Sequence, residues 1–357
     1  MTRPKPHLLK IYRTPPKKED RLKFLRLDKN EDNVCLPKEI VQKILSKVTP
    51  DFVASYPQTY PLYESLGRWL GVGEDHILVT AGSDAAIKAV FEAFVVPGDE
   101  VVAPHPTFAM FGVYSKIFQA KLKRVVYETD LSLSMKKMLK SVSSKTKLAV
   151  LANPNSPTGT VVERSDILDL LELAKKRGAA VLIDEAYHHF YPKSVIDLID
   201  KYPNLIVTRT FAKAFGLASV RLGYAVAHPK TIKILRVSKP MYEVNSFAVL
   251  FGCALLDHPE WMEHNVRETL RGKKYIVDEI ERLGLRVFPS HANFILVEVG
   301  EKNVKPLVRK MYNSGILINS GYEHETLKRC IRISLGPEEK MRKVVKVLKD
   351  YFRRRGI

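Results

Sequence analysis

The 357-residue sequence predicts an α/β fold of two domains, a large one built on a mostly parallel sheet and a smaller α/β one. From about residue 62, short apolar runs alternate with helical segments, a pattern typical of a parallel sheet covered by helices on both faces. The length favours two domains, and 45% hydrophobic residues suffice for a large core. We expect residues 46–245 to form the larger domain, and residues 1–45 with 246–357 to form the smaller one.

Each expected strand is a short apolar run between turn and helix signals. Residues 1 to about 45 look irregular, because prolines stiffen their start, and they lead into a helix. The strands expected in the larger domain are 77–80, 100–103, 148–152, 180–183, 205–208 and 223–226. A mainly helical stretch follows Pro240 to about residue 283, and the N-terminal arm is expected to join the domain beyond it. The strands of that domain are 285–288, 294–297, 316–318 and 331–334, interleaved with two helices.

Composition argues against several classes of protein. The N-terminus is basic, but no apolar segment of a signal peptide follows it, and no run approaches the roughly 18 apolar residues of a membrane span. We therefore expect a cytoplasmic protein without a membrane partner. Cys35, Cys253 and Cys330 are widely spaced and form no CxxC pair, so neither a disulfide framework nor a metal site is expected.

The formal net charge of +19 suits nucleic acid, an acidic membrane surface or an anionic substrate. The basic residues are spread along the chain, however, and no module interleaves them with aromatic residues. This distribution favours a charge-rich, solvated surface, and no nucleic-acid partner is expected. A field that attracts phosphate-bearing ligands is the alternative that the charge leaves open.

A phosphate site is suggested by Gly82, Ser83 and Asp84, which lie between an expected strand and a helix. Backbone N–H groups converge at such a helix start and can hold an anion. The same pattern also fits an ordinary helix cap after a strand. Thr210 and Arg221 favour the anion site, because a hydroxyl and a guanidinium could complete it.

Three further side chains indicate chemistry at the carboxyl ends of the expected strands. Asp184 ends an apolar strand, at the edge where ligands bind in open α/β sheets. Tyr187 follows on the same side of a turn, and Lys213 lies in an apolar stretch that tolerates an amine only if it is neutral or covalently engaged. Taken singly, Asp184 could cap a helix and Lys213 could lie in solvent. Phe108 could stack on a ligand ring or pack in the core.

The order and spacing of four segments resemble those of the fold-type I, pyridoxal-phosphate-dependent aminotransferases of class I and II. The segments are Asn155-Ser-Pro-Thr-Gly159, Asp184-Glu-Ala-Tyr187, Thr210-Phe-Ala-Lys213 and Arg221-Leu-Gly-Tyr224. Residues 27–31, 55–57 and 330–336 are similar to the histidinol-phosphate aminotransferase-like branch of that family. The resemblance covers about residues 24–350 and implies the fold of the family, with pyridoxal 5′-phosphate as cofactor.

The resemblance implies a role for each matching residue. Lys213 would bond to the aldehyde of the cofactor and then move a proton between the substrate's Cα atom and the cofactor. Asp184 would pair with the pyridine nitrogen, Tyr187 with the phenolate oxygen, and Phe108 would stack on the ring. The phosphate would be held by Gly82, Ser83, Asp84, Thr210 and Arg221.

The resemblance also implies a homodimer with active sites at the subunit interface. Tyr56 is similar to a tyrosine that contacts the phosphate from the neighbouring subunit. Arg332 would grip the anionic group of the substrate in a bidentate fork, and Asn30 would line the substrate cleft.

Three positions depart from the family pattern. Ala212 stands where a serine commonly precedes the lysine, which removes one phosphate hydroxyl but leaves Thr210. Ser156 stands where an asparagine usually contacts the phenolate oxygen, and either Ser156 or Asn155 could serve. Asn319 stands where histidinol-phosphate enzymes tend to carry an arginine for the substrate phosphate, which argues against histidinol phosphate as the substrate.

The leading hypothesis is a pyridoxal-phosphate-dependent aminotransferase of amino-acid biosynthesis. It would move an amino group between glutamate or 2-oxoglutarate and a small anionic, histidinol-phosphate-like amine or amino acid. One alternative is a lyase on the same scaffold, such as a decarboxylase resembling threonine-phosphate decarboxylase. Another is a ligand sensor or nucleic-acid-associated regulator, against which the intact Lys213, Asp184 and Arg332 argue. The sequence leaves the identity of the substrate open.

Overall fold

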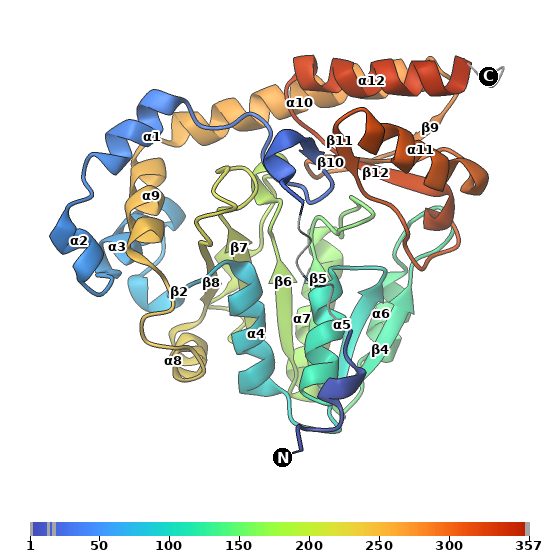
Figure 1. The fold of residues 1–357 in the computed structure, drawn as a ribbon. Helices are drawn as coiled ribbons and strands as arrows, with labels where there is room; N and C mark the ends of the chain where they lie inside the picture. The colour runs from blue at the N-terminus through green and yellow to red at the C-terminus, as the bar shows by residue number, and fades with distance from the viewer. Residues whose placement is uncertain (1–2, 13–14, 16–18, 354–357) are drawn as a thin grey trace.

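A seven-stranded sheet lies at the centre of the computed structural model (Figure 1). The structure describes residues 3–12, 15 and 19–353. The remaining residues, all within the expected smaller domain, are 1–2, 13–14, 16–18 and 354–357. The order of the strands is β2 (Ile77–Thr80), β8 (Gly223–Ala227), β7 (Leu205–Thr210), β6 (Ala180–Asp184), β5 (Thr146–Ala152), β3 (Glu100–His105) and β4 (Lys121–Val126). β8 is antiparallel to both neighbours and the other pairs are parallel, which confirms a mostly parallel sheet.

Helices cover both faces of the sheet because successive strand residues, such as Val181 and Leu182, are apolar and point to opposite faces. One face packs against α3 (Tyr60–Leu70), α6 (Met135–Ser141), α7 (Arg164–Arg177) and α9 (Ser246–Asp257). The other packs against α4 (Ser83–Phe94), α5 (Ala109–Ile117) and α8 (Pro229–Val237). Short 3₁₀ helices lie at Leu8–Lys10, Arg21–Lys23, Glu74–His76, His188–Phe190, Ile196–Leu198 and Leu327–Arg329.

The C-terminal part forms smaller sheets with a core of their own. An antiparallel sheet consists of β12 (Cys330–Ser334), β10 (Phe294–Glu298) and β9 (Arg286–Phe288), and a parallel pair consists of β1 (Leu25–Leu27) and β11 (Ile316–Ile318). These strands pack against α10 (Pro259–Glu281), α11 (Glu301–Asn313) and α12 (Glu338–Arg353). The pairing of β1 with β11 joins the N-terminal arm to the C-terminal strands.

The arm continues through α1 (Lys38–Leu45) and α2 (Pro50–Ala54) to the large sheet. The division into two domains at residues 45 and 245 stays a prediction. Although α9 lies beyond residue 245, its apolar side chains pack in the core of the large sheet, beside those of α3.

Two strands, β1 and β4, are not among those predicted from apolar runs in the sequence. β4 lies at the edge of the large sheet and buries only Val125 fully, while Lys121 and Arg124 are exposed. Charged side chains on an edge strand discourage pairing with another chain, and they also hide the strand from a search for apolar runs. β1 has three residues and depends on a partner strand far along the chain.

Among the described residues, no helix is both long and apolar enough to cross a bilayer. Within the same part of the chain, no group of three or more His, Cys, Asp or Glu side chains is placed to hold a metal ion. Cys35, Cys253 and Cys330 are free thiols, of which only Cys35 is exposed.

Gly272 allows α10 to pack closely against the turn that follows β12. A Cβ atom there would lie 1.9 Å from the carbonyl oxygen of Gly336 and 3.1 Å from Met341 Cγ. We expect Gly272→Ala to lower the free energy of unfolding by about 1–3 kcal/mol, because a backbone group cannot move aside cheaply. Thermal or chemical unfolding of the purified variant measures the change.

The matched control is Gly112→Ala, which also adds a methyl group within a helix. Its Cβ atom would meet Leu122 Cδ2 at 3.9 Å, an ordinary contact. The helix propensity of alanine should leave this variant as stable as the wild type or up to about 1 kcal/mol more stable. Equal stability of the two variants would contradict the packing argument.

Candidate active site

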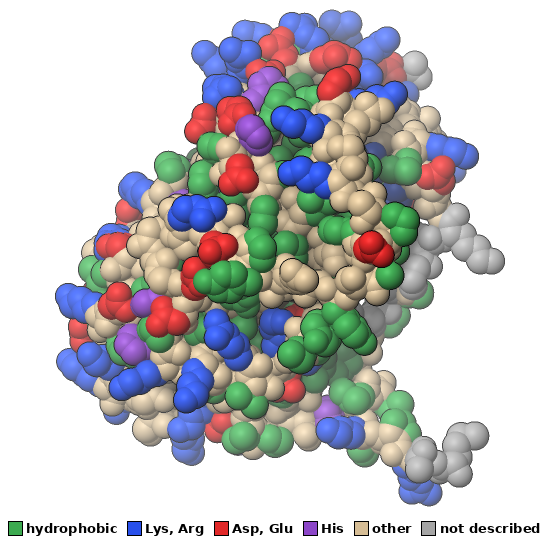
Figure 2. Space-filling view, turned by 90° about the vertical axis from the view of Figure 1, so that its left-hand side faces the viewer, with side chains coloured by type: hydrophobic (Ala, Val, Ile, Leu, Met, Phe, Trp, Pro, Cys, Tyr) green, Lys and Arg blue, Asp and Glu red, His purple; other side chains and the backbone are tan. Residues whose placement is uncertain are grey.

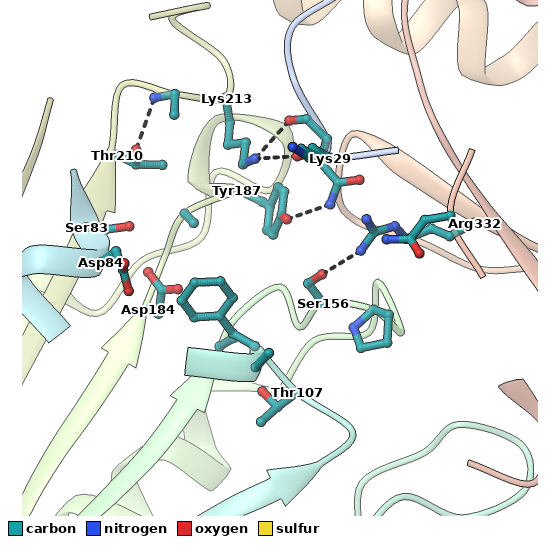
Figure 3. Close-up of a pocket in the computed structure, with 18 of the residues that line it drawn as sticks. Lys29, Ser83, Asp84, Thr107, Ser156, Asp184, Tyr187, Thr210, Lys213 and Arg332 are labelled. Carbon is teal, nitrogen blue, oxygen red and sulfur yellow. Dashed lines mark hydrogen bonds between the residues drawn. The ribbon is translucent and has the colours of Figure 1, made fainter. Parts of the chain in front are cut away.

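A cavity of about 410 Å³ lies between the carboxyl ends of the central strands, the N-terminal arm and β12 (Figure 3). The expected site residues that line it are Asn30, Ser83, Asp84, Phe108, Ser156, Asp184, Tyr187, Thr210, Lys213, Arg221 and Arg332. Gly82, Asn155 and Tyr56 are not part of its wall. The fold therefore brings most of these residues together although they span nearly the whole chain.

One end of the cavity is the N-terminus of α4, where Ser83 and Asp84 begin the helix. A Cβ atom on Gly82 would lie 2.8 Å from Arg221 Nη2, so glycine lets the guanidinium approach the helix start. Gly82 also has a φ of 85°, a region that favours glycine. Thr210, at the end of β7, lies on the same wall. Backbone N–H groups, the helix dipole and a guanidinium converge here, so this end fits a phosphate group.

Asp184 ends β6 and is only 5% exposed. Its Oδ1 atom accepts a hydrogen bond of 2.9 Å from the hydroxyl of Thr208, the paired residue on β7. Burial raises the pKa of Asp184 to about 7, and the charges of Glu185 and Asp84 act in the same direction. A buried carboxylate of this kind is stabilised by a positively charged ring nitrogen, so the middle of the cavity fits a pyridinium ring.

Glu185, the next residue, forms bonds within the protein core and does not line the cavity. It forms a buried ion pair of 2.8 Å with Arg209, and Ser194 Oγ donates to the same carboxylate oxygen at 2.8 Å. Successive side chains of an extended chain point to opposite sides, which separates the two adjacent acids. One acid therefore faces the cavity while the other is neutralised beneath it.

Lys213 extends into the cavity after β7. Its Nζ atom donates to the carbonyl oxygen of Asn30 at 2.9 Å and to that of Lys29 at 3.1 Å. Burial lowers the pKa of the Lys213 amine to about 8, and the charge of Arg332 acts in the same direction. An amine with such a pKa is partly neutral near neutral pH and can act as a nucleophile or carry a proton.

Tyr187 lies next to this lysine, whose Nζ atom is 5.9 Å from the centre of the tyrosine ring. Asn30 Nδ2 donates a hydrogen bond of 2.8 Å to the Tyr187 hydroxyl. Ser334 holds Asn30 in turn, because its hydroxyl accepts from the Asn30 backbone N–H at 2.9 Å. Burial raises the pKa of Tyr187, so its hydroxyl stays protonated and able to donate. Phe108, at the start of α5, adds an aromatic wall.

Arg332 comes from β12 and is 7% exposed. Its Nη1 atom donates to Ser156 Oγ at 3.2 Å, as Figure 3 shows, and its Nη2 atom donates to the carbonyl oxygen of Asp28 at 2.7 Å. The guanidinium carbon lies 5.2 Å from the centre of the Phe294 ring. These partners are a hydroxyl and a carbonyl group rather than a carboxylate, so the guanidinium can still pair with an anionic ligand.

Asn155 and Ser156, the alternatives for one contact, differ in position. Asn155 Nδ2 donates to the carbonyl oxygen of Pro106 at 3.0 Å and to Thr158 Oγ1 at 2.9 Å. Its Oδ1 atom accepts from the hydroxyl of Thr107 at 2.6 Å. Asn155 thus braces two loops, and only Ser156 lines the cavity.

Tyr56 does not line the cavity of its own chain. It is 74% exposed and stacks on Tyr242, with ring centres 4.3 Å apart.

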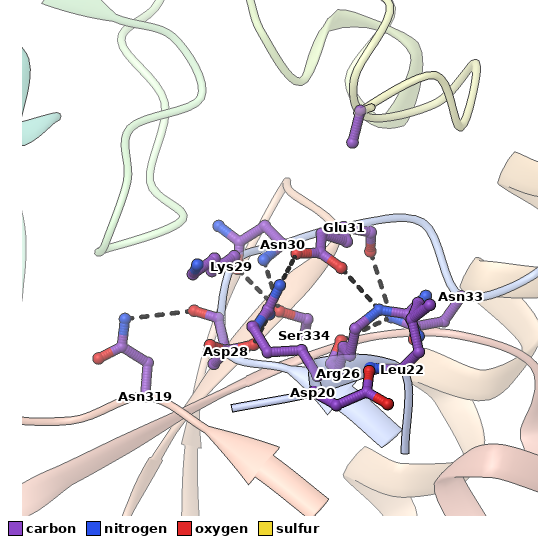
Figure 4. A network of polar contacts seen from close by, with 12 residues as sticks. Asp20, Leu22, Arg26, Asp28, Lys29, Asn30, Glu31, Asn33, Asn319 and Ser334 are labelled. Carbon is purple, nitrogen blue, oxygen red and sulfur yellow. Dashed lines mark hydrogen bonds and ion pairs between the residues drawn. The ribbon is translucent and has the colours of Figure 1, made fainter. Parts of the chain in front are cut away.

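Sequence patterns did not reveal how the N-terminal arm is fastened (Figure 4). Arg21 forms ion pairs with Asp28 at 2.5 Å and with Glu31 at 2.6 Å, and Arg26 forms one with Glu31 at 2.8 Å. Asn319 Nδ2 donates to the carbonyl oxygen of Asp28 at 3.2 Å. The many charges of both signs in residues 20–31 are the signal that could have indicated such a network.

Residues 26–348 match the family described as aminotransferase class I and II. The histidinol-phosphate aminotransferase of Thermoanaerobacter sp. (strain X514) is 35% identical over 329 residues, which are 91% of this chain and 92% of the relative. That of Methanocaldococcus jannaschii is 31% identical over 337 residues, which are 92% of this chain and 89% of the relative.

Two solved structures are similar in fold. The histidinol-phosphate aminotransferase of Sinorhizobium meliloti, in complex with pyridoxal 5′-phosphate, has a TM-score of 0.89 at 24% identity and covers 99% of this chain and 98% of its own. The L-threonine-O-3-phosphate decarboxylase of Porphyromonas gingivalis has a TM-score of 0.77 at 23% identity, with 92% and 99% covered. The fold is that of the fold-type I pyridoxal-phosphate enzymes. The family match and the relatives above 30% identity show that this chain belongs to the class I and II aminotransferases.

Proposed function

We propose that this aminotransferase moves an amino group between glutamate or 2-oxoglutarate and a small anionic amine or amino acid, in amino-acid biosynthesis. The observation that carries the proposal is the meeting of Lys213, Asp184 and Arg332 in one cavity of about 410 Å³. These residues offer a proton carrier, a charge partner for a ring nitrogen and an anchor for a substrate anion. The names of the relatives, which are histidinol-phosphate aminotransferases, support this class of substrate.

The cofactor is pyridoxal 5′-phosphate, which when bound supplies an aldehyde for the amino group and a ring that accepts electrons. Lys213 would hold its aldehyde carbon. The lowered pKa of Lys213, about 8, supports a role in carrying protons near neutral pH. In this proposal Lys213 Nζ moves the proton of the substrate's Cα atom.

The remaining cavity residues would fix the cofactor in place. The buried carboxylate of Asp184 would pair with the pyridine nitrogen, the hydroxyls of Tyr187 and Ser156 would face the phenolate oxygen, and Phe108 would stack on the ring. The residues proposed for the phosphate are Gly82, Ser83, Asp84, Thr210 and Arg221. The open helix start and the close approach of the Arg221 guanidinium to Gly82 support this end as the phosphate site.

Arg332 would bind the anionic group of the substrate, beside Asn30 on the cleft wall. Asn319 lines the same cavity with a neutral amide, which is bonded to the carbonyl oxygen of Asp28. It adds no positive charge to that of Arg332. This arrangement favours a substrate that presents a carboxylate to Arg332 over a phosphate ester that needs a second cation.

We also propose a homodimer in which Tyr56 completes the active site of the partner. Exposed apolar and aromatic side chains gather around Tyr56 on the face formed by α1, α2 and α9, part of which faces the viewer in Figure 2. They include Val53 at 66% exposure, Tyr60 of the adjoining α3 at 62%, Tyr242 at 48% and Phe247 at 40%. Apolar groups gathered on one face support an interface between subunits.

The free thiols support a cytoplasmic location. Cys35 is exposed and unpaired, and unpaired exposed thiols are kept in that form by a reducing compartment. We therefore infer that the enzyme works in the cytoplasm.

Lys213→Ala should abolish the half-reaction with L-glutamate. The wild-type protein loaded with cofactor should change its visible absorption band when glutamate is added, whereas the variant should be slower by at least about 10²-fold, because the proton carrier is missing. Lys136→Ala, which removes an exposed lysine of α6, is the control and should behave as the wild type. Retained turnover in Lys213→Ala would refute the catalytic role of Lys213. Release of carbon dioxide by the wild-type protein would favour the lyase.

Asp184→Asn should change how the stability of the cofactor-free protein depends on pH. The carboxyl group has an ordinary pKa of 3.8 and a folded-state pKa of about 7. Between these values the folded state binds more protons than the unfolded state, so the wild type loses stability as the pH rises from about 4 to 7. Asparagine has no proton to lose. The difference in free energy of unfolding, variant minus wild type, should increase by about 1 kcal/mol or more from pH 5 to pH 8. Thermal unfolding at both pH values measures it, and a constant difference would contradict the assignment.

Mixing Lys213→Ala with Tyr56→Ala should restore activity if the sites are shared. A hybrid dimer of the two variants has one site with both native residues, since Lys213 and Tyr56 of that site come from different subunits. After joint refolding or co-expression, glutamate turnover should exceed that of either variant alone. Turnover that equals the average of the separate variants would show that Tyr56 serves its own chain or no site.

A further inference from the structure

The polar side chains in the wall of the cavity around Arg332 differ in whether they already form hydrogen bonds within the protein. Asn319 uses both ends of its amide, because Nδ2 donates to the carbonyl oxygen of Asp28 at 3.2 Å and Oδ1 accepts from the backbone N–H of Ser320 at 2.7 Å. Ser156 accepts a hydrogen bond from Arg332. Neither residue is therefore free to rearrange for a ligand without losing a bond.

Tyr322 lines the same cavity and differs from these residues. Its hydroxyl oxygen is buried and has no hydrogen-bond partner among the described residues. The ring packs against the apolar cluster that includes Leu327 and Phe288, which fixes its position. The centre of the ring lies 5.9 Å from the guanidinium carbon of Arg332. An unpaired phenol is thus held beside the guanidinium.

The protonation state of Tyr322 makes it a donor. Burial raises its pKa to about 12, although the charge of Arg332 opposes the shift. The phenol therefore keeps its proton at any physiological pH. The Nε atom of Arg332 is likewise buried without a partner in the described part of the chain. Both residues line the cavity, and two unsatisfied donors so close to it are unfavourable unless an acceptor binds to them.

We propose that the Tyr322 hydroxyl donates a hydrogen bond to the substrate anion that Arg332 binds, and that Tyr322 is a specificity-determining residue for the amino transfer. The inference rests on the role of Arg332 in the proposed function. A planar guanidinium and a neutral phenol together present donors to a carboxylate from two directions. An uncharged substrate lacks the negative charge that strengthens these hydrogen bonds, so it gains less from this pair.

The test compares Tyr322→Phe with the wild type, both loaded with cofactor. Succinate, a dicarboxylate without an amino or keto group, cannot react and reports binding alone. Its dissociation constant is measured by calorimetry and by the shift of the visible absorption band. Loss of a hydrogen bond to a charged group should weaken succinate binding by about tenfold or more, while the absorption band without succinate stays unchanged.

Tyr312→Phe is the matched control. It removes a hydroxyl from a tyrosine of α11 that is 46% exposed and packs against Phe24, away from the cavity. Succinate should bind to this variant as it binds to the wild type. Equal binding of succinate to Tyr322→Phe and the wild type would overturn the proposal.

Thermal unfolding of the ligand-free proteins gives a second, independent readout. Phenylalanine keeps the ring and removes only an unpaired hydroxyl, so Tyr322→Phe should unfold at the same temperature as the wild type or higher. A fall of about 4 °C or more would reveal a structural partner of the hydroxyl and overturn the proposal. Failure of the wild type itself to bind succinate would overturn the anion role of Arg332, and this inference with it. Turnover with glutamate tests the proposed function separately.

Discussion

The backbone carbonyl groups of Asp28, Lys29 and Asn30 hold the two cations on which the site depends. Lys213 Nζ donates to Lys29 and Asn30 at 3.1 and 2.9 Å, and Arg332 Nη2 donates to Asp28 at 2.7 Å. Lys213 follows a strand of the large sheet and Arg332 belongs to β12, so one short segment of the arm connects both parts of the molecule. Buried cations need such acceptors because they repel one another and have lost their water.

Burial brings the pKa values of two different residues close to neutral pH. Burial raises the pKa of Asp184 to about 7 and lowers that of Lys213 to about 8. In each case the charged form is the one that loses hydration, so an acid and a base shift toward each other. Because the cavity shields both groups from water, ordinary Asp and Lys side chains can exchange protons there near neutral pH.

The positions of Asp184 and Lys213 were predictable because strand ends and local sequence determine them. The segment around each residue carries its own signal, and parallel strands place their ends at one edge. Asn155 could not be assigned from the sequence, since its bonds to two loops exist only after those loops fold together. The role proposed for Tyr322 could not be predicted from the sequence either. It depends on the distance between its ring and Arg332 and on a hydroxyl without a partner in the described part of the chain. Contacts between distant segments carry this information, and the order of residues does not.

The pairing of the arm with the last strands has a consequence for protein synthesis. The backbone N–H of Asn30 donates to Ser334 across 304 residues, and β1 finds its partner in β11. A chain is made from its N-terminus, so the arm leaves the ribosome long before these partners exist. Until they emerge, the carbonyl groups of Lys29 and Asn30 are present, but the strands that hold the arm against Lys213 are not. A polypeptide released before β11 and β12 are made would therefore contain Lys213 but could not form the cavity in which this lysine acts.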